Sequence, residues 1–398
     1  MNARPPVTDW LTDFDHLAPQ WIEDPFPIWD EMRSKCPIAH TERFNGVYLP
    51  TRFADVKAIA YDTEYFSSKR VVVREKYLPD VAAPPITSDP PHHRAARMVL
   101  LPAFTPKAIE RLEDKTRALC NELIDRILAK DDVDGALDYA QHIPVRIIAH
   151  MLGLPDSSGD LFREWIHLVL VAGIDDFEAL KRGMTEMSAY FAQQIATRKA
   201  DPGDDLISYL LNAEFEGHRF DDMHVLGTLR LLLIAGIDTT WSGLGSSIWH
   251  LATHEHDRMR LVAEPELIPT AIEEFLRAYS PVTMARVVRE DTQVSGCPMK
   301  AGQAILLSFP AANRDPEMFP DADKVIIDRK ENRHAAFGLG IHRCIGSNLA
   351  RMEMTVAVRE WLKRIPEFRL DPAKPVQWSA GTVRGPRTLP LLLGAPAA

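Results

Sequence analysis

Residues 337 to 346 read FGLGIHRCIG and place Cys344 among three glycines, just before a long helical pattern. Thiolate is the form of cysteine that binds metals. Exposed backbone N–H groups, the cation of Arg343 and a following helix N-terminus all favour that form. The three glycines of this stretch can adopt positive φ and let the backbone pass close to a flat or bulky group. The stretch therefore predicts a metal-binding thiolate beside a bound cofactor.

Three other interpretations of the same stretch were compared with this one. A dinucleotide-binding fingerprint needs a further glycine where Arg343 stands and a strand leading into the loop. Structural zinc sites use paired cysteines, a spacing that His334, His342 and Cys344 do not provide. An inert cysteine in a glycine turn stays open on these residues alone, so the rest of the chain must decide.

Length, composition and charge limit the class of protein. The 398 residues are 46% hydrophobic, enough for a large core, and length alone suggests two or three domains. The net charge is -10 and no basic run resembles a nucleic-acid footprint, so no nucleic-acid partner is expected. Four scattered cysteines without a C-x-x-C pair fit a reducing compartment, and the polar N-terminus resembles no signal peptide or membrane anchor. We therefore expect a soluble cytoplasmic protein that does not bind membranes.

Helical periodicity dominates the chain, and shorter β-type runs lie between Gly and Pro residues. The fold is therefore expected to be mainly α, with small sheets beside a helical body. Helices are predicted over residues 106–130, 161–199, 222–254, 267–279 and 346–364, and strands over 46–49, 287–294, 304–308 and 389–393.

The second informative stretch is a hydrophobic helix that contains an acid and two threonines. From residue 226 the chain reads LGTLRLLLIAGIDTTWSGLGSSIWHLATH, so Asp238, Thr239 and Thr240 interrupt an apolar run. Burying such groups costs about 1 to 3 kcal/mol on mutational scales unless they are paired. Thr239 can return its hydroxyl to the carbonyl of Ala235, and a small molecule could sit beside that turn. An ordinary Ser/Thr-rich helix interior explains the threonines but not the acid, and the charges argue against a membrane span.

A third set of residues carries charge. Glu274 and Arg277 in EEFLR lie three apart and can pair on one helical face, although such pairs are common on surfaces. Four basic side chains elsewhere could converge on a dianionic cofactor. They are His93, Arg97, Arg286 and His342.

Taken together, AGIDTT, EEFLR, AANRDP and FGLGIHRCIG occur in the order and at the separations of the cytochrome P450 family, which this sequence resembles from about residue 20 to the C-terminus. The resemblance implies one triangular, mainly α heme domain over residues 1–398 with a smaller β-rich part, in place of the two or three domains suggested by length. Residues 1–20 would then be a poorly ordered N-terminal extension. Cys344 would be the axial thiolate ligand of heme b, where it donates electron density that favours O–O cleavage.

The resemblance also implies roles for the other singled-out residues. Asp238 and Thr239 match the family's acid-alcohol pair, with Asp238 relaying protons and Thr239 orienting the oxygen ligand. His93, Arg97, Arg286 and His342 fall where the family binds the heme propionates. Glu274 and Arg277 match a structural pair and take no part in chemistry. Further cofactor contacts are expected from Ala235, Phe337, Gly338 and Gly346.

One departure from the family pattern lies at DADKVIID. Many relatives carry Arg-Phe where this chain has Lys324 and Val325. The third arginine of the structural network is therefore expected to be replaced or weakened, because lysine lacks the planar fork of a guanidinium.

The function implied by the resemblance is a heme-thiolate monooxygenase that hydroxylates or oxidatively dealkylates a small hydrophobic or aromatic molecule. NAD(P)H electrons would arrive through a separate ferredoxin and ferredoxin reductase, with Arg343 and Arg351 as a docking surface on a monomeric enzyme. Two alternatives stay open: a peroxide-driven peroxygenase and a heme-binding sensor without catalysis. A polar substrate contact is conceivable at Arg74, His167 or Arg384.

Overall fold

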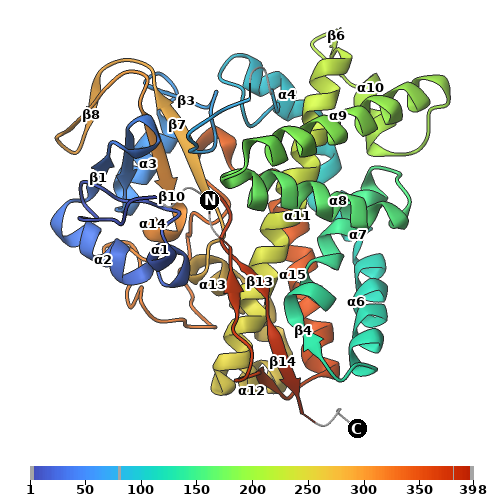
Figure 1. Cartoon of the computed structure of the whole chain (residues 1–398). Helices are drawn as coiled ribbons and strands as arrows, with labels where there is room; N and C mark the ends of the chain where they lie inside the picture. Colours follow the sequence, from blue (N-terminus) through green and yellow to red (C-terminus); the bar gives the residue numbers. More distant parts are fainter. Residues whose placement is uncertain (1–3, 79–81, 380, 395–398) are drawn as a thin grey trace.

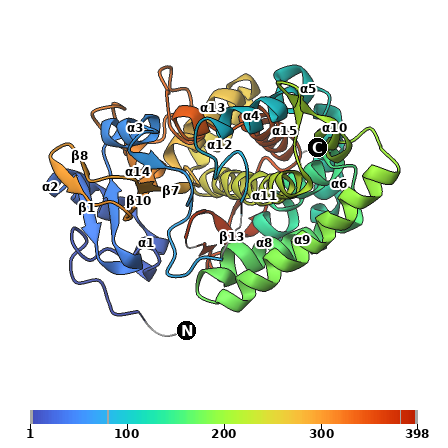
Figure 2. The ribbon, with the colours of Figure 1, turned by 90° about the horizontal axis from the view of Figure 1, so that it is seen from above.

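The computed structural model describes residues 4–78, 82–379 and 381–394. A large helical body and a smaller β-rich part lie side by side, and the N-terminal segment belongs to the β-rich part (Figure 1). Seen from above, α9 runs along the outer edge of the helical body and α11 passes through its middle (Figure 2). The mainly α architecture with small sheets confirms the predicted fold class.

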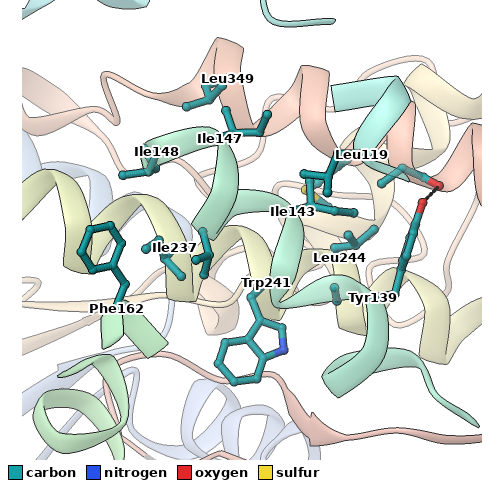
Figure 3. Close-up of a cluster of buried hydrophobic side chains, with 14 of the residues drawn as sticks. Leu119, Tyr139, Ile143, Ile147, Ile148, Phe162, Ile237, Trp241, Leu244 and Leu349 are labelled. Atoms are coloured by element: carbon teal, nitrogen blue, oxygen red, sulfur yellow. Dashed lines mark hydrogen bonds between the residues drawn. The ribbon is translucent and has the colours of Figure 1, made fainter. Parts of the chain in front are cut away.

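The central helix α11 spans Asp222–Thr253 and is the longest in the protein's described part. It starts where the Asp221 carboxylate accepts from the His224 N–H, a standard N-cap that satisfies an otherwise unpaired donor. Most of its residues are buried because α7 (His142–Met151), α9 (Phe177–Ala200) and α15 (Ser347–Arg364) pack around it. Figure 3 shows Ile237, Trp241 and Leu244 of α11 close to the isoleucines of α7 in this core.

Two of the predicted helices are interrupted in the structure. The helix predicted over 106–130 is divided by a turn at Arg111 and Leu112 into α5 (Pro106–Glu110) and α6 (Glu113–Leu128). The predicted helix over 161–199 is wrong: α8 (Gly159–Ile166) continues into a π turn and a short 3-10 turn, and α9 begins anew at Phe177 with Asp176 as its N-cap. Gly173 permits this break, since a Cβ there would lie 2.5 Å from the Leu168 carbonyl oxygen. The other helices are α1 (Pro19–Glu23), α2 (Phe26–Lys35), α3 (Phe53–Tyr61), α4 (His92–Leu100), α10 (Leu206–Asn212), α12 (Glu255–Ala263), α13 (Ile268–Ala278) and α14 (Phe309–Ala312).

The largest sheet has five strands in the order β1-β2-β10-β7-β3. Strands β2 and β10 run parallel, and the other neighbours are antiparallel. The predicted strand over 287–294 is wrong, because β7 ends at Val288 and a polar turn precedes β8. The sheet consists of β1 (Ile38–Thr41), β2 (Val47–Pro50), β10 (Ala304–Ser308), β7 (Thr283–Val288) and β3 (Phe66–Ser67).

Smaller sheets complete the fold. Strand β14 pairs with both β11 and β4, and β12 and β13 form a hairpin that lies against α11. The remaining pairs are β5 with β6 and β8 with β9. Their bounds are β4 (Val133–Asp134), β5 (Glu214–Phe215), β6 (His218–Arg219), β8 (Thr292–Val294), β9 (Cys297–Met299), β11 (Phe368–Leu370), β12 (Gln377–Trp378), β13 (Pro386–Thr388) and β14 (Pro390–Leu393).

The N-terminal segment packs onto the β-rich part from residue 4 onward. Phe14 is fully buried beside Trp21, and Arg43 donates to both carboxylate oxygens of Asp13, at 2.7 and 2.8 Å. Residues 4–20 are therefore an integral layer, in contrast to the poorly ordered extension expected from the sequence. Residues 1–3 lie outside the described ranges.

By length and composition alone, α11 is apolar enough to cross a membrane, and the sequence-based argument against this was wrong on that point. However, 61% of its most apolar window is buried inside the protein. Because packing already covers this surface, α11 is a core helix.

Glu274 and Arg277, the structural pair expected from the sequence, form an ion pair in the structure. Arg277 donates to both oxygens of Glu274, each at 2.8 Å, and both side chains are completely buried. The same guanidinium donates to the carbonyl oxygens of Asn313, Ala322 and Lys324. A buried ion pair is stable only when its remaining donors are satisfied, and these carbonyls satisfy them.

The expected weakening of the third arginine is wrong. Arg329 donates to both carboxylate oxygens of Glu274, at 3.1 and 3.0 Å, and to the carbonyl oxygens of Pro320 and Asp321. The Lys324 side chain instead pairs with exposed Asp321. The network of Glu274, Arg277 and Arg329 is therefore complete, and its second arginine stands five positions after Lys324.

Candidate active site

The cysteine loop is shaped by two residues with positive φ. Gly338 and Gly340 have φ of 71° and 68°. A Cβ on Gly340 would lie 2.3 Å from the Ala60 carbonyl oxygen, so only glycine fits there. The expectation of positive φ at Gly346 is wrong, because this residue has φ of -82° and serves as N-cap of α15. The Cys344 N–H donates to the Phe337 carbonyl at 2.7 Å, which fixes the cysteine at the helix entrance.

A largely apolar cavity of about 220 Å³ separates this loop from α11. Cys344 lies on its walls together with Thr239 and the surrounding turns of α11. Nine of the eleven predicted site residues are on these walls: Arg97, Ala235, Thr239, Arg286, Phe337, Gly338, His342, Cys344 and Gly346. Further wall residues, which sequence analysis missed, include Leu100, Phe104, Phe309, Leu339, Ile345, Leu349 and Met354.

The ionisation of Cys344 differs from the expectation based on its flanking residues. The side chain is exposed only toward the cavity. Burial raises the pKa of the Cys344 thiol, although the Gly346 N–H, Arg97 and Arg343 oppose this shift. Desolvation thus outweighs the favourable charges in the protein alone. A cationic partner in the cavity is needed to favour the thiolate.

Thr239 lies where the sequence predicted. Its hydroxyl donates to the Ala235 carbonyl oxygen at 2.8 Å, the back-bond expected for a threonine inside a helix. Ala235 and Gly236 of the same turn also line the cavity. A Cβ on Gly236 would lie 2.9 Å from the Ile148 side chain, so the glycine lets α7 and α11 pack closely there.

Asp238 is not on the cavity wall. It is fully buried, and its two carboxylate oxygens accept from the two terminal nitrogens of Arg387, at 2.6 and 2.9 Å. Arg387 belongs to β13, 149 residues further along the chain. The cost of burying the acid is therefore offset by a bidentate, charge-assisted pair.

Comparisons with known proteins agree with this geometry. The family model described as cytochrome P450 matches residues 255–379. A mycinamicin IV hydroxylase/epoxidase of Micromonospora griseorubida is 33% identical over 92% of this chain and 94% of its own length. A steroid C26-monooxygenase of Mycolicibacterium smegmatis is 35% identical, over 91% of this chain and 90% of its own.

The chain belongs to the cytochrome P450 family. A crystal structure of the P450 CYP109E1 from Bacillus megaterium in complex with testosterone has a TM-score of 0.86 at 32% identity, covering 92% of this chain and 97% of that one. This P450 is accordingly a heme-containing oxidoreductase of the monooxygenase class.

The basic residues around the cavity of the P450 fit the two propionates of heme. Arg97, Arg286 and His342 line the cavity. Arg286 makes one hydrogen bond, to the neighbouring Ala285 carbonyl, and the Arg97 guanidinium makes none within the described residues. Burial lowers the pKa of Arg286 to about 10, and the carboxylate of Asp89 opposes this shift only in part. Two such guanidinium groups facing one cavity suit a dianionic ligand.

His93 lies behind the cavity wall. It is 5% exposed, and its ring packs edge-on against His342 with centroids 4.4 Å apart. Its Nε2 is buried and has no partner among the described residues, which is consistent with a polar group of the cofactor nearby. Sequence analysis missed Ser68, whose hydroxyl lies 2.9 Å from His342 Nε2. Ser68 directly follows β3 and lies 274 residues before His342, a relation that no local pattern reveals.

The two arginines expected to dock the ferredoxin have different surroundings in the P450. Arg351 donates to both oxygens of Glu273, at 2.7 and 2.9 Å, and stacks over Phe337. Arg343 is exposed and pairs with no carboxylate within residues 4–78, 82–379 and 381–394. Arg351 therefore supports the cysteine loop, and Arg343 is the available cation.

None of the three polar residues that the sequence offers as substrate contacts lines the described cavity. Arg384 donates to the carbonyls of Ile22 and Glu23, so it fastens the N-terminal segment. His167 is exposed on the π turn, and Arg74 reaches the Val169 carbonyl at 3.4 Å. The polar side chains on the cavity wall are therefore Thr239, Thr240 and the basic residues already described.

Proposed function

We propose that this chain is a heme-thiolate monooxygenase in which Cys344 is the axial ligand of heme b. One observation carries the proposal: the Cys344 thiol and the Thr239 hydroxyl lie on the walls of the same apolar cavity. Arg97, Arg286 and His342 would hold the propionates, with His93 supporting His342 from behind. When bound, heme supplies the reductive activation of dioxygen, and its iron provides the cation that favours the thiolate.

The contributions of the protein to this reaction are exclusion of water and control of protons. The Thr239 hydroxyl hydrogen is directed to Ala235, so its oxygen is free to accept a hydrogen bond from a group in the cavity. Asp238 would supply the proton, because it is the acid next to Thr239 on α11. Its present pairing with Arg387 means that it must move before it can do so.

We infer a neutral, apolar substrate that is hydroxylated or oxidatively dealkylated. The cavity walls carry Pro85, Leu231, Val282 and other apolar side chains, and no acidic side chain. Such walls bind by hydrophobic burial and discriminate by shape. Two of the similar proteins are named for mycinamicin IV and for a steroid, so we propose a bulky ring-containing molecule as the substrate class.

We further propose that NAD(P)H electrons reach the heme through a separate ferredoxin and its reductase, in the cytoplasm, with the P450 acting as a monomer. Exposed Arg343 lies directly beside Cys344 and would attract an acidic carrier to the shortest path toward the iron. Arg343→Glu should slow reduction by ferredoxin about tenfold at low salt, and less at high salt because the attraction is screened. Unchanged reduction rates at every salt concentration would refute this docking site.

The ligand assignment is tested by the absorption spectrum of the reduced protein with carbon monoxide. Wild-type protein should show the strongly red-shifted Soret band of a thiolate complex, and Cys344→Ser should lose it. Cys297→Ser, which changes a cysteine of β9, should keep it. A wild-type band at the position typical of histidine ligation would overturn the proposal.

The substrate class is tested by titrating the ferric protein with matched neutral and acidic molecules, such as testosterone and a steroid carboxylic acid. Displacement of water from the iron changes the spin state and hence the spectrum. We expect neutral compounds to bind more tightly than their carboxylate counterparts. Tighter binding of the acids would show that a cation reaches the substrate.

A further inference from the structure

The pair between Asp238 and Arg387 connects the centre of α11 to the C-terminal hairpin. Its two hydrogen bonds measure 2.6 and 2.9 Å, and the side chain of Arg387 is only 14% exposed. Bidentate pairs of this kind are directional, and a low-dielectric environment strengthens them. The carboxylate of Asp238 is therefore held in one orientation.

That orientation keeps Asp238 away from the cavity. Successive residues of an α-helix are rotated by about 100°, so Asp238 and Thr239 face different directions. Thr239 lines the cavity and Asp238 does not. Proton transfer from Asp238 to a group in the cavity thus requires its side chain to release at least one bond to Arg387 and rotate.

The position of Arg387 is fixed by close packing of the hairpin on α11. A Cβ on Gly385 would lie 2.3 Å from the Ser242 side chain, and one on Gly245 would lie 2.8 Å from the Pro386 ring. The guanidinium also lies over the Trp241 ring, 4.7 Å from its centroid. Because neither glycine has room for a side chain, a shift of the hairpin relative to α11 moves Arg387 relative to Asp238.

The same segment also supports the cavity wall. Val383 forms a β-bridge with Val282, and the Arg384 N–H donates to the Pro281 carbonyl at 2.7 Å. Pro281 and Val282 both line the cavity. Residues 383–387 thus contact the cavity wall through Val383 and bind the Asp238 carboxylate through Arg387.

We propose that Arg387 is a positioning residue that keeps the proton-relay acid withdrawn, and that a molecule pressing on Pro281 and Val282 loosens this pair. Proton supply is then linked to an occupied cavity, which limits futile reduction of dioxygen when the cavity is empty. This inference rests on the proposed function, since it assigns Asp238 to the relay.

Infrared spectroscopy tests the pairing without turnover. The carboxylate stretch of Asp238 is identified in ferric protein with labelled aspartate as the band lost in Asp238→Asn. We expect it to shift when 4-phenylimidazole, an apolar azole that ligates heme iron, fills the cavity of the wild type. In Arg387→Gln the band should already be displaced, and the azole should not move it further. A band unaffected by the azole or by Arg387→Gln would overturn the proposal.

A kinetic test asks whether Arg387 acts through Asp238. We expect dithionite-reduced, substrate-free Arg387→Gln protein to be reoxidised by dioxygen about tenfold faster than wild type, with a changed solvent isotope effect. In an Asp238→Asn background the same substitution should have no effect, because contacting residues are not additive. Equal acceleration in both backgrounds would show that Arg387 does not work through the acid.

Two further variants separate this role from a general structural one. Arg387→Lys keeps the charge without the fork and should give an intermediate rate, which also tests the idea if Arg387→Gln does not fold. Arg384→Gln alters the same hairpin without touching Asp238 and should reoxidise like wild type. If Arg384→Gln accelerates reoxidation equally, the hairpin rather than the pair is responsible. Loss of the thiolate-type carbonyl spectrum in wild type would instead refute the proposed function.

Discussion

At the scale of single residues, two side chains of the site are governed by competing physical effects. Burial opposes ionisation of Cys344 more strongly than its neighbouring cations favour it. The Thr239 hydroxyl is already bonded to its own helix, so it enters the cavity as an acceptor. Both side chains are therefore poised for a partner that the polypeptide alone does not supply.

Replacement of Thr239 tests its assigned role. Thr239→Ala removes the acceptor from the cavity and should lower product formed per NADH by about tenfold, with a matching rise in released hydrogen peroxide. Thr239→Ser keeps the hydroxyl and should restore most of the coupling. The measurement is the ratio of product and peroxide to NADH consumed. Product formation driven by peroxide alone, at the same rate in Thr239→Ala, would favour a peroxygenase.

At the scale of elements, the buried cluster around Glu274 holds α13 against the segment that leads into the cysteine loop. Glu274 accepts from Arg277, from Arg329 and from the Ile326 N–H. The sequence correctly predicted the pair but not its third member, because Arg329 lies five residues after the position where the family pattern places an arginine.

A matched pair of variants tests this assignment. Arg329→Lys keeps the charge but loses the fork, and we expect it to cost about 2 kcal/mol or more of unfolding free energy. Lys324→Arg should change stability by less than about 0.5 kcal/mol, since the Lys324 side chain lies on the surface. Urea unfolding of the heme-loaded proteins measures both. Equal effects of the two changes would contradict the assignment.

The turn at Gly340 provides a second test at this scale. Both Gly340 and Gly302 have a positive φ, so alanine strains the backbone at either position. In Gly340→Ala the new Cβ also meets the Ala60 carbonyl oxygen, whereas in Gly302→Ala it has no heavy atom within 4 Å. Backbone strain alone costs about 1 kcal/mol, and overpacking adds about 1 to 3 kcal/mol. We therefore expect the larger loss of thermal stability, and faster loss of heme, in Gly340→Ala. Similar losses in both variants would mean that α3 moves aside freely.

At the scale of the whole molecule, acid should unfold the protein partly through its buried histidines. Burial lowers the pKa of His16 to about 3, against an ordinary value of about 6.5 in the unfolded chain. Folded protein thus keeps His16 neutral while unfolded protein binds a proton. The contribution of neutral His16 to the free energy of unfolding is complete above about pH 6.5. It is lost progressively as the pH falls toward about 3, by at most about 5 kcal/mol.

This dependence can be measured by urea unfolding at several pH values between 7 and 4. His16→Phe removes the titrating group beside Phe44 and should reduce the loss of stability on acidification. His256→Gln changes an 89% exposed side chain and should leave the slope unchanged. An unchanged slope in His16→Phe would show that the buried imidazole does not contribute.

The features of the fold and the site that can be predicted from sequence are those whose interacting residues lie close together in the chain. Motifs and periodicity located Cys344, Thr239 and the central helix, because these depend on neighbours within a few residues. The partner of Asp238 lies 149 positions away, and no local pattern connects the two. The break before α9 was missed for a similar reason, since Gly173 is required by contacts with Leu168 and Leu180 that only the folded chain brings together.

The acceptors of Arg277 have a consequence for how this region evolves. Three of its hydrogen bonds end on backbone carbonyls, at residues 313, 322 and 324. Every amino acid carries that oxygen, so a change of side chain at an exposed position leaves the arginine with its partner. Position 324 is exposed, whereas Ala322 is buried in the core. We therefore expect natural relatives to vary freely at position 324 yet to preserve the path of the chain, and a library that randomises this codon to yield many folded variants.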